Sequence, residues 1–125
     1  MRLLLDTHVL LWALADVDRL DPASRLALTA GANDVAVSVA SIWEVGIKRA
    51  LGKLTLEGSL ADHAERSGFR ILPILAAHAE RAGSLPAHHR DPFDRMLIAQ
   101  ALEEGLTLVT RDPVLVRYGV PTFPA

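Results

Sequence analysis

Short apolar runs alternate with helical patterns along the whole chain, and this alternation constrains the fold more than any other feature. The runs have the length and composition of buried strands, and we predict strands at residues 2–6, 34–38, 69–74, 106–109 and 120–123. Helical patterns lie between them. A strand–helix–strand order of this kind predicts an α/β fold in three layers, with a mostly parallel central sheet flanked by helices.

Helix-start signals and apolar spacing place the helices. Asp21-Pro22 has the order of an N-cap and a first helical residue, and Asp91-Pro92 and Asp112-Pro113 repeat it. We predict helices at 7–15, 22–30, 39–51, 59–67, 77–82 and 92–104, a short one after Asp112, and a loop at 83–90.

Two tryptophans are assigned to the core rather than to base stacking. The segment 39–51 carries apolar residues nearly all round, which predicts a helix packed deep in the domain. It contains Trp43, and the first predicted helix contains Trp12. We therefore expect both side chains to be buried.

Length and composition limit the class of protein. A chain of 125 residues fits a single domain spanning 1–125, and the 50% of hydrophobic residues supply a core. The absence of cysteine excludes disulfides, zinc–thiolate clusters and thiol nucleophiles. A formal net charge of −2 lacks the basic balance typical of nucleic-acid binding, although arginines could still gather on one face.

The start of the chain does not resemble a targeting segment. Its apolar run reaches Asp6 after only a few residues, whereas a secretory signal needs a longer run and a small-residue cleavage site. No apolar run approaches the roughly 20 residues that span a bilayer. We expect a soluble, cytoplasmic protein without membrane association.

Acidic residues lie at four separate junctions between predicted strands and helices. They are Asp6, Glu44, Asp94 and Asp112. In a parallel sheet these junctions share one edge, so residues far apart in sequence can meet there. Close carboxylates repel each other and raise each other's pKa, and a bound Mg²⁺ or Mn²⁺ relieves that repulsion. The pattern predicts a metal-dependent hydrolytic site.

Each acid also has a local, structural alternative. Asp6 and Asp112 are placed to cap helices, and Asp94 lies in a first helical turn, where an acid favours the helix dipole. We interpret Asp91 as the N-cap before Pro92. Capping alone does not explain why four separate units each contribute one acid.

The glutamate has a similar alternative. Ser41 and Glu44 have the spacing of a capping box, although Ser38 is better placed as the cap. Glu44 lies between Trp43 and Val45 in an apolar helix, and burying a carboxylate without a partner costs several kcal/mol, roughly. This favours a site over a cap.

Four segments together resemble a known family. LLLDTHVLLW (3–12), SVASIWEVGIK (38–48), HHRDPFDRMLIAQAL (88–102) and LVTRD (108–112) look like a PIN domain, and in particular like the toxins of VapBC-type toxin–antitoxin systems. The resemblance covers almost the whole chain, in the family's order and with similar gaps.

The resemblance implies a single-domain, metal-dependent endoribonuclease that uses Mg²⁺, or Mn²⁺, and leaves a 5′-phosphate and a 3′-hydroxyl. It implies that the catalytic metal ligands are Asp6, Glu44, Asp94 and Asp112, with Asp91 as a possible extra member. It also implies an RNA substrate, a homodimer, and a cognate antitoxin that blocks the active site of this toxin.

Hydroxyls and arginines flank the acids and are candidates for supporting roles. The hydroxyls that could orient carboxylates, or be ordinary turn and cap groups, are those of Thr7, Ser41 and Thr110. The arginines that could grip phosphate, or pair with nearby acids, are Arg90, Arg95 and Arg111. We expect the adjacent His88 and His89 to contact solvent rather than to act in catalysis.

Two other functions remain open from the residues. A haloacid-dehalogenase-like phosphatase also begins with a strand ending in aspartate, but it needs a second acid where this chain has His8, and a lysine where it has Arg111. A catalytically inactive PIN-fold binding module would tolerate the loss of any one acid. The presence of all four favours the nuclease.

Overall fold

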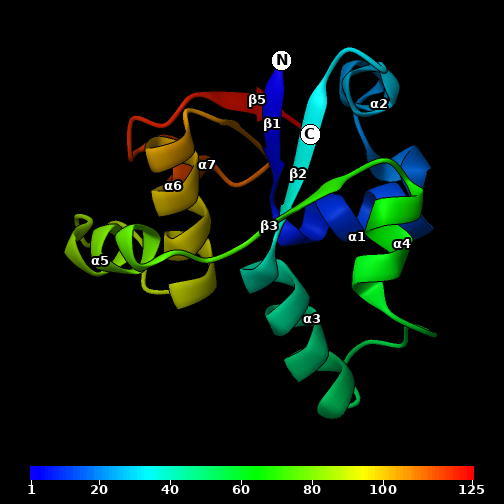
Figure 1. The fold of residues 1–125 in the computed structure, drawn as a ribbon, viewed down its shortest axis with the longest axis horizontal. Helices are drawn as coiled ribbons and strands as arrows, with labels where there is room; N and C mark the ends of the chain where they lie inside the picture. Colours follow the sequence, from blue (N-terminus) through cyan, green and yellow to red (C-terminus); the bar gives the residue numbers. More distant parts are fainter.

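A five-stranded, fully parallel sheet forms the centre of the molecule (Figure 1). The computed structural model describes residues 1–125. The strand order is β3-β2-β1-β4-β5. The strands are β1 (Arg2–Leu5), β2 (Asp34–Ser38), β3 (Arg70–Leu72), β4 (Thr107–Thr110) and β5 (Thr122–Pro124). Leu3 of the central β1 pairs with Val35 on one side and Thr107 on the other. The predicted α/β fold is confirmed.

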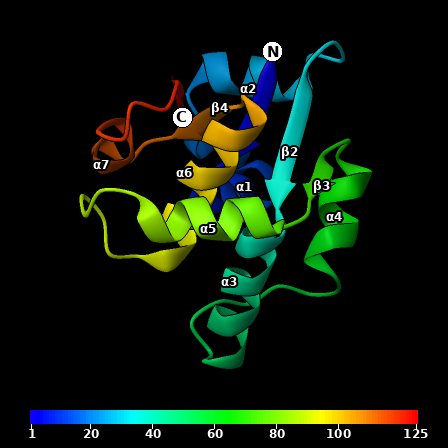
Figure 2. The ribbon, with the colours of Figure 1, turned by 60° about the vertical axis from the view of Figure 1, so that its left-hand side comes forward.

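Helices cover both faces of this sheet. They are α1 (Thr7–Ala15), α2 (Pro22–Thr29), α3 (Val39–Ala50), α4 (Leu60–Arg66), α5 (Ala76–Ser84), α6 (Pro92–Glu104) and α7 (Pro113–Val116), with a 3-10 turn η1 (Val17–Arg19) after α1. Figures 1 and 2 show α1, α2 and α4 on one side of the sheet, and α5, α6 and α7 on the other. No helix is both long and apolar enough to cross a membrane.

Alternation along the strands divides the core between the two faces. Leu3 and Leu5 point to the cluster under α1, α2 and α4, while Leu4 between them points to the cluster under α6 and α7. All three are fully buried. Burial on both faces explains why the strands have continuous apolar sequences.

The predicted caps form as expected. The Asp21 carboxylate accepts from the backbone N–H of Ala23 at 3.0 Å, and Ser38, rather than Ser41, caps α3 by accepting from Ala40 at 2.9 Å. The helix α6 ends at Gly105, whose φ of 65° is left-handed. These caps fix where the helices begin relative to the strand ends.

The prediction of a deeply packed helix at 39–51 was wrong. In both views α3 continues past the end of β2 and extends beyond the sheet (Figures 1 and 2). Trp43, assigned to the core, is 63% exposed and lies in a T-shaped arrangement with the Phe93 ring, with 5.1 Å between centroids. Trp12 is partly buried against the core, as expected.

Several element boundaries differ from the prediction by one or two residues, those of β3 and α5 among them. The strand expected at 69–74 is limited to Arg70–Leu72, because Pro73 follows and cannot donate to the ladder. It does lie at the edge of the sheet. The helix expected at 77–82 extends to Ser84, two residues into the predicted loop.

Candidate active site

A hollow of about 370 Å³ opens at the carboxyl end of β1 and β4. It is lined by Asp6, His8, Val9, Trp12, Asp94, Arg111 and Asp112. Three of the predicted acids therefore meet here, from the end of β1, the first turn of α6 and the residue that caps α7. The shared edge of a parallel sheet brings them together, as the topology requires.

Asp6 is buried and held from β4. The residue is 6% exposed, and its Oδ2 accepts a hydrogen bond from the Thr110 hydroxyl at 2.8 Å. Burial raises the pKa of Asp6, and the bond from Thr110 opposes that rise. Asp6 makes no side-chain hydrogen bond to the start of α1, so the local capping alternative does not account for it.

Thr110 links two of the acids. Its hydroxyl donates to Asp6 and accepts the backbone N–H of Asp112 at 3.0 Å. Asp112 in turn caps α7 by accepting from Val114 at 2.9 Å, which leaves its second oxygen, Oδ2, toward the hollow. The capping alternative and the site assignment are thus both compatible with Asp112.

Replacing Thr110 with valine is expected to lower the free energy of unfolding by about 1–3 kcal/mol at neutral pH, because a buried carboxylate and a backbone N–H each lose a partner. Urea denaturation measures this. Thr107→Val, on the same strand but half-buried, is the control. Equal effects of the two substitutions would contradict a specific role for the Thr110 hydroxyl.

Asp94 carries the largest electrostatic perturbation. It lies in the first turn of α6, and its pKa is raised to about 7. Burial is the main cause, followed by the negative charges of Asp6 and Asp91, while His89 acts in the opposite direction. A carboxyl group this perturbed, in a hollow with other acids, is typical of a functional site.

Glu44 lies on α3 beside the other acids. It is 8% exposed, and its Oε2 is 3.2 Å from the Lys48 ammonium, whereas its Oε1 is buried without any hydrogen-bond partner. Its negative charge contributes to the raised pKa of both Asp6 and Asp94. Three of the predicted acids therefore line one hollow, and the charge of the fourth, Glu44, acts on two of them.

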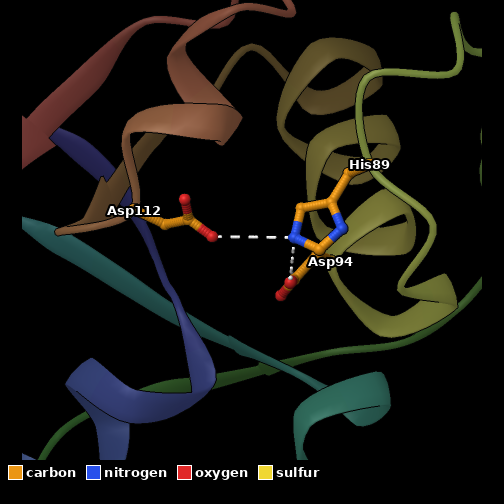
Figure 3. A group of neighbouring side chains, drawn as sticks. All are labelled: His89, Asp94 and Asp112. Carbon is orange, nitrogen blue, oxygen red and sulfur yellow. Dashed lines mark ion pairs between the residues drawn. The ribbon is translucent and has the colours of Figure 1, made fainter.

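His89 is the residue that sequence reasoning missed. Its Nε2 lies 2.9 Å from Oδ2 of Asp94 and 3.6 Å from Oδ2 of Asp112 (Figure 3). One ligand atom from each of the three residues lies within 4.8 Å of the others, so this group could hold a metal ion. The expectation of mere solvent contact was wrong for His89. The sequence did place His89 two residues before the N-cap Asp91, and this position could have indicated that its ring lies near the start of the helix carrying Asp94.

Two of the flanking hydroxyls bond to each other instead of to a carboxylate. The Thr7 hydroxyl donates to Ser41 at 2.9 Å in a buried contact that ties α1 to α3. The nearby backbone of Thr7 opposes the rise in the pKa of Asp6. The side chains of Thr7 and Ser41 therefore join α1, which Asp6 precedes, to α3, which carries Glu44.

Arg95 does not face the acids. Its guanidinium donates to backbone carbonyls at 2.8–3.3 Å, and so it organises the loop before α6. The carbonyls belong to Ala82, Leu85, Pro86 and His89. Because both Nη1 and Nη2 donate to the backbone, the contacts favour a loop-organising role for Arg95 over a phosphate contact or an acid pair.

The other two arginines lie beside the site. Arg111 lines the hollow, stacks over the Trp12 ring at 4.4 Å, and donates to the carbonyls of Arg19 and Ala125. Arg90 is exposed and lines an adjoining hollow together with Glu44. Each therefore lines a hollow together with at least one of the predicted acids.

A larger hollow, of about 510 Å³, lies elsewhere on the molecule. It is bounded by α2, the end of α4 and the start of β2, and its charged lining residue is Arg25. It contains no carboxylate, and it lies at the amino ends of the strands. Size alone does not identify the chemistry, so the smaller acidic hollow is the candidate site.

Comparisons with known proteins agree on one family. The family model of the PIN domain matches residues 3–121. Ribonuclease VapC22 of Mycobacterium tuberculosis (strain ATCC 25618 / H37Rv) is 36% identical over 117 residues, covering 87% of this chain and 85% of that protein.

Solved structures share the fold at lower identity. VapBC2 from Rickettsia felis, crystallised with a DNA fragment from its promoter, has a TM-score of 0.74 at 19% identity and covers 100% of this chain and 99% of its own. FitAcB from Neisseria gonorrhoeae has a TM-score of 0.64 at 24% identity, covering 97% and 96%.

Proposed function

Because this chain belongs to the PIN domain family, we propose that it is a divalent-metal-dependent endoribonuclease, the toxin of a type II toxin–antitoxin pair. The observation that carries the proposal is the meeting of Asp6, Asp94 and Asp112 in one hollow, with Glu44 near enough to perturb two of them. The 36% identity to a protein named as a ribonuclease supports RNA as the substrate.

The residues present fit a hard divalent cation. The donors are carboxylate oxygens, which Mg²⁺ and Mn²⁺ prefer. Glu44 has a buried oxygen without any hydrogen-bond partner, and such a group is costly unless something pairs with it. Burial first, and then the negative charges of Asp6 and Asp91, raise the pKa of Asp94, and a bound cation would favour its ionised form. We propose Mg²⁺, with Mn²⁺ as a substitute.

We assign Asp6 and Asp94 as the main ligands. When bound, the cation activates the attacking water and neutralises charge on the phosphoryl oxygens. Thr110 holds the Asp6 carboxylate in a fixed orientation by its hydrogen bond. Glu44 binds the cation or positions the water, and Asp112 serves a second ion or an outer water. The products are a 5′-phosphate and a 3′-hydroxyl.

The RNA backbone needs positive charge beside the acids. Arg111 is suited to this because it lines the hollow and, unlike Arg95, has only its Nη2 bonded to backbone carbonyls, which together with stacking on Trp12 holds the guanidinium in place. Arg90, exposed in the adjoining hollow, is the second candidate for a phosphate contact.

A protein partner is also part of the proposal. Exposed apolar side chains recur every four residues along and just after α3, which favours contact with another protein. They are Val39, Trp43, Ile47 and Leu51. The structural neighbours named VapBC support a cognate antitoxin that covers the active site, and we propose a cytoplasmic homodimer as the toxin form.

A cleavage assay tests the function. We expect the purified chain to cleave a labelled single-stranded RNA in the presence of Mg²⁺ or Mn²⁺. EDTA should abolish the cleavage, and excess metal should restore it. Asp6→Asn is expected to slow cleavage by at least about 100-fold, since it removes a charged ligand. Asp62→Asn, an exposed acid on α4, is the matched control. Equal cleavage with metal, with EDTA and by Asp6→Asn would refute the nuclease.

A further inference from the structure

His89 lies between Asp94 and Asp112 in the candidate site. The hydrogen bond made by its other ring nitrogen, Nδ1, indicates what Nε2 can do there. Figure 3 shows the ring between Asp94 and Asp112, with Nε2 toward both carboxylates. An imidazole nitrogen beside two carboxylates has the composition of a mixed metal-ligand set. Position alone therefore suggests that His89 is a ligand.

The tautomer argues against ligation. The backbone N–H of Asp91 donates to Nδ1 of His89 at 3.1 Å, so Nδ1 presents a lone pair. In a neutral imidazole the proton then resides on Nε2, and Nε2 is a donor. Histidines that bind metals show the reverse arrangement, because their other nitrogen donates a hydrogen bond. Nε2 therefore presents a proton, and no lone pair, beside the two carboxylates, at 2.9 Å from Oδ2 of Asp94 and 3.6 Å from Oδ2 of Asp112.

We propose that His89 is a positioning residue, whose Nε2–H orients the carboxylates of Asp94 and Asp112 for the cation without binding the cation itself. This inference rests on the proposed metal site. It assigns to His89, through its 2.9 Å contact with Asp94, the task that the Thr110 hydroxyl performs for Asp6, namely fixing the direction of a ligand carboxylate.

The loop holds the ring firmly enough for such a task. The backbone N–H of His89 donates to the Tyr118 hydroxyl at 2.7 Å, and its carbonyl accepts from Arg95 at 3.3 Å. Asp91, which fixes the tautomer, also caps the helix that carries Asp94. The His89 ring and the Asp94 carboxylate are thus both held at the start of α6, and that cap sets their separation.

Pulsed EPR of bound Mn²⁺ tests the inference directly. We expect no coupling from a directly coordinated imidazole nitrogen in the wild-type protein. A nitrogen coupling that disappears in His89→Ala would show that His89 is a ligand and would overturn the proposal. A loop residue with a purely structural role would not produce this nitrogen coupling, so the coupling reports on direct coordination alone.

A titration of Mn²⁺ affinity supplies the second readout. We expect His89→Ala to weaken binding by about 10–100-fold. His89→Gln should recover most of that loss, because its amide can still donate. His88→Ala, on the neighbouring side chain that packs against Tyr118, is the matched control and should change affinity less than about twofold. Circular dichroism checks that each variant folds.

The outcomes separate this inference from the proposed function. Unchanged affinity in His89→Ala, or failure of His89→Gln to recover it, removes the role of His89 and leaves the metal site intact. Absence of Mn²⁺ binding by the wild type, or full binding by Asp6→Asn, removes the metal site and both proposals with it.

Discussion

Asp94→Asn is expected to make the metal-free protein more stable at alkaline pH while eliminating RNA cleavage. The Asp94 carboxyl has a pKa of about 7 in the folded protein, against an ordinary value of 3.8, because burial and the charges of Asp6 and Asp91 disfavour its ionised form. Asparagine has the same shape and no charge. It therefore removes the repulsion together with the ligand.

The sign of the pH dependence follows from proton binding. Between pH 3.8 and about 7 the folded protein holds a proton on Asp94 that the unfolded chain has released. Stability therefore falls as pH rises through this window, and the whole penalty is present above it. A difference of about three pKa units corresponds to roughly 4 kcal/mol. We expect a gain of about 2–4 kcal/mol for Asp94→Asn at pH 8, and almost none at pH 4.

Thermal or urea unfolding at several pH values, in EDTA, measures this gain. Asp34→Asn is a control of opposite sign, because Arg70 binds Asp34 through two 3.1 Å hydrogen bonds and lowers its pKa. That variant should lose stability at pH 8. In the wild type, Mg²⁺ should raise the melting temperature more at pH 8 than at pH 5. A destabilised Asp94→Asn at pH 8 would contradict the electrostatic account of the site.

The sequence was sufficient to predict the acids because topology alone brings them together. An alternating order of buried strands and helices leaves few arrangements besides a parallel sheet, and the strand ends of such a sheet share one edge. Asp6 and Asp112 follow β1 and β4, which are neighbours in the sheet. Their convergence required no knowledge of side-chain geometry.

The errors concern what lies around those acids. Apolar residues on all sides of α3 suggested burial, but the sequence does not show how far a helix extends past the sheet it leaves, so Trp43 was misplaced. His89 was assigned to solvent because the path of a loop is not encoded in its composition. Its ring lies beside Asp94 of α6, and the loop is held there by the Asp91 N–H bond to the ring and by the Arg95 bond to the His89 carbonyl.

Arg95 follows Asp94 directly, and proximity in sequence suggested that it binds phosphate or pairs with an acid. The structure instead surrounds its guanidinium with four backbone carbonyls of the segment 82–89. A planar group with five N–H donors can satisfy several carbonyls at once, whereas lysine cannot reproduce that geometry. Arg95 thus stabilises the loop beside the site rather than contacting a ligand in it.

Arg95→Ala is expected to lower the free energy of unfolding by about 3 kcal/mol, since hydrogen bonds from a charged donor contribute roughly 1.5–3 kcal/mol each and do not add. The loop that carries His89 should lose its fixed path, so Mn²⁺ affinity should fall as it does in His89→Ala. Arg95→Lys should restore little of either property.

Urea denaturation gives the stability change, and amide hydrogen exchange shows whether residues 85–91 lose protection. Arg90→Ala is the matched control, because Arg90 is exposed in the same loop and should change stability by less than about 0.5 kcal/mol. It should instead slow cleavage by weakening the contact with the RNA backbone. If both substitutions affected RNA binding alone and left unfolding unchanged, Arg95 would be a phosphate contact after all, because a residue that stabilises the loop must act through the fold.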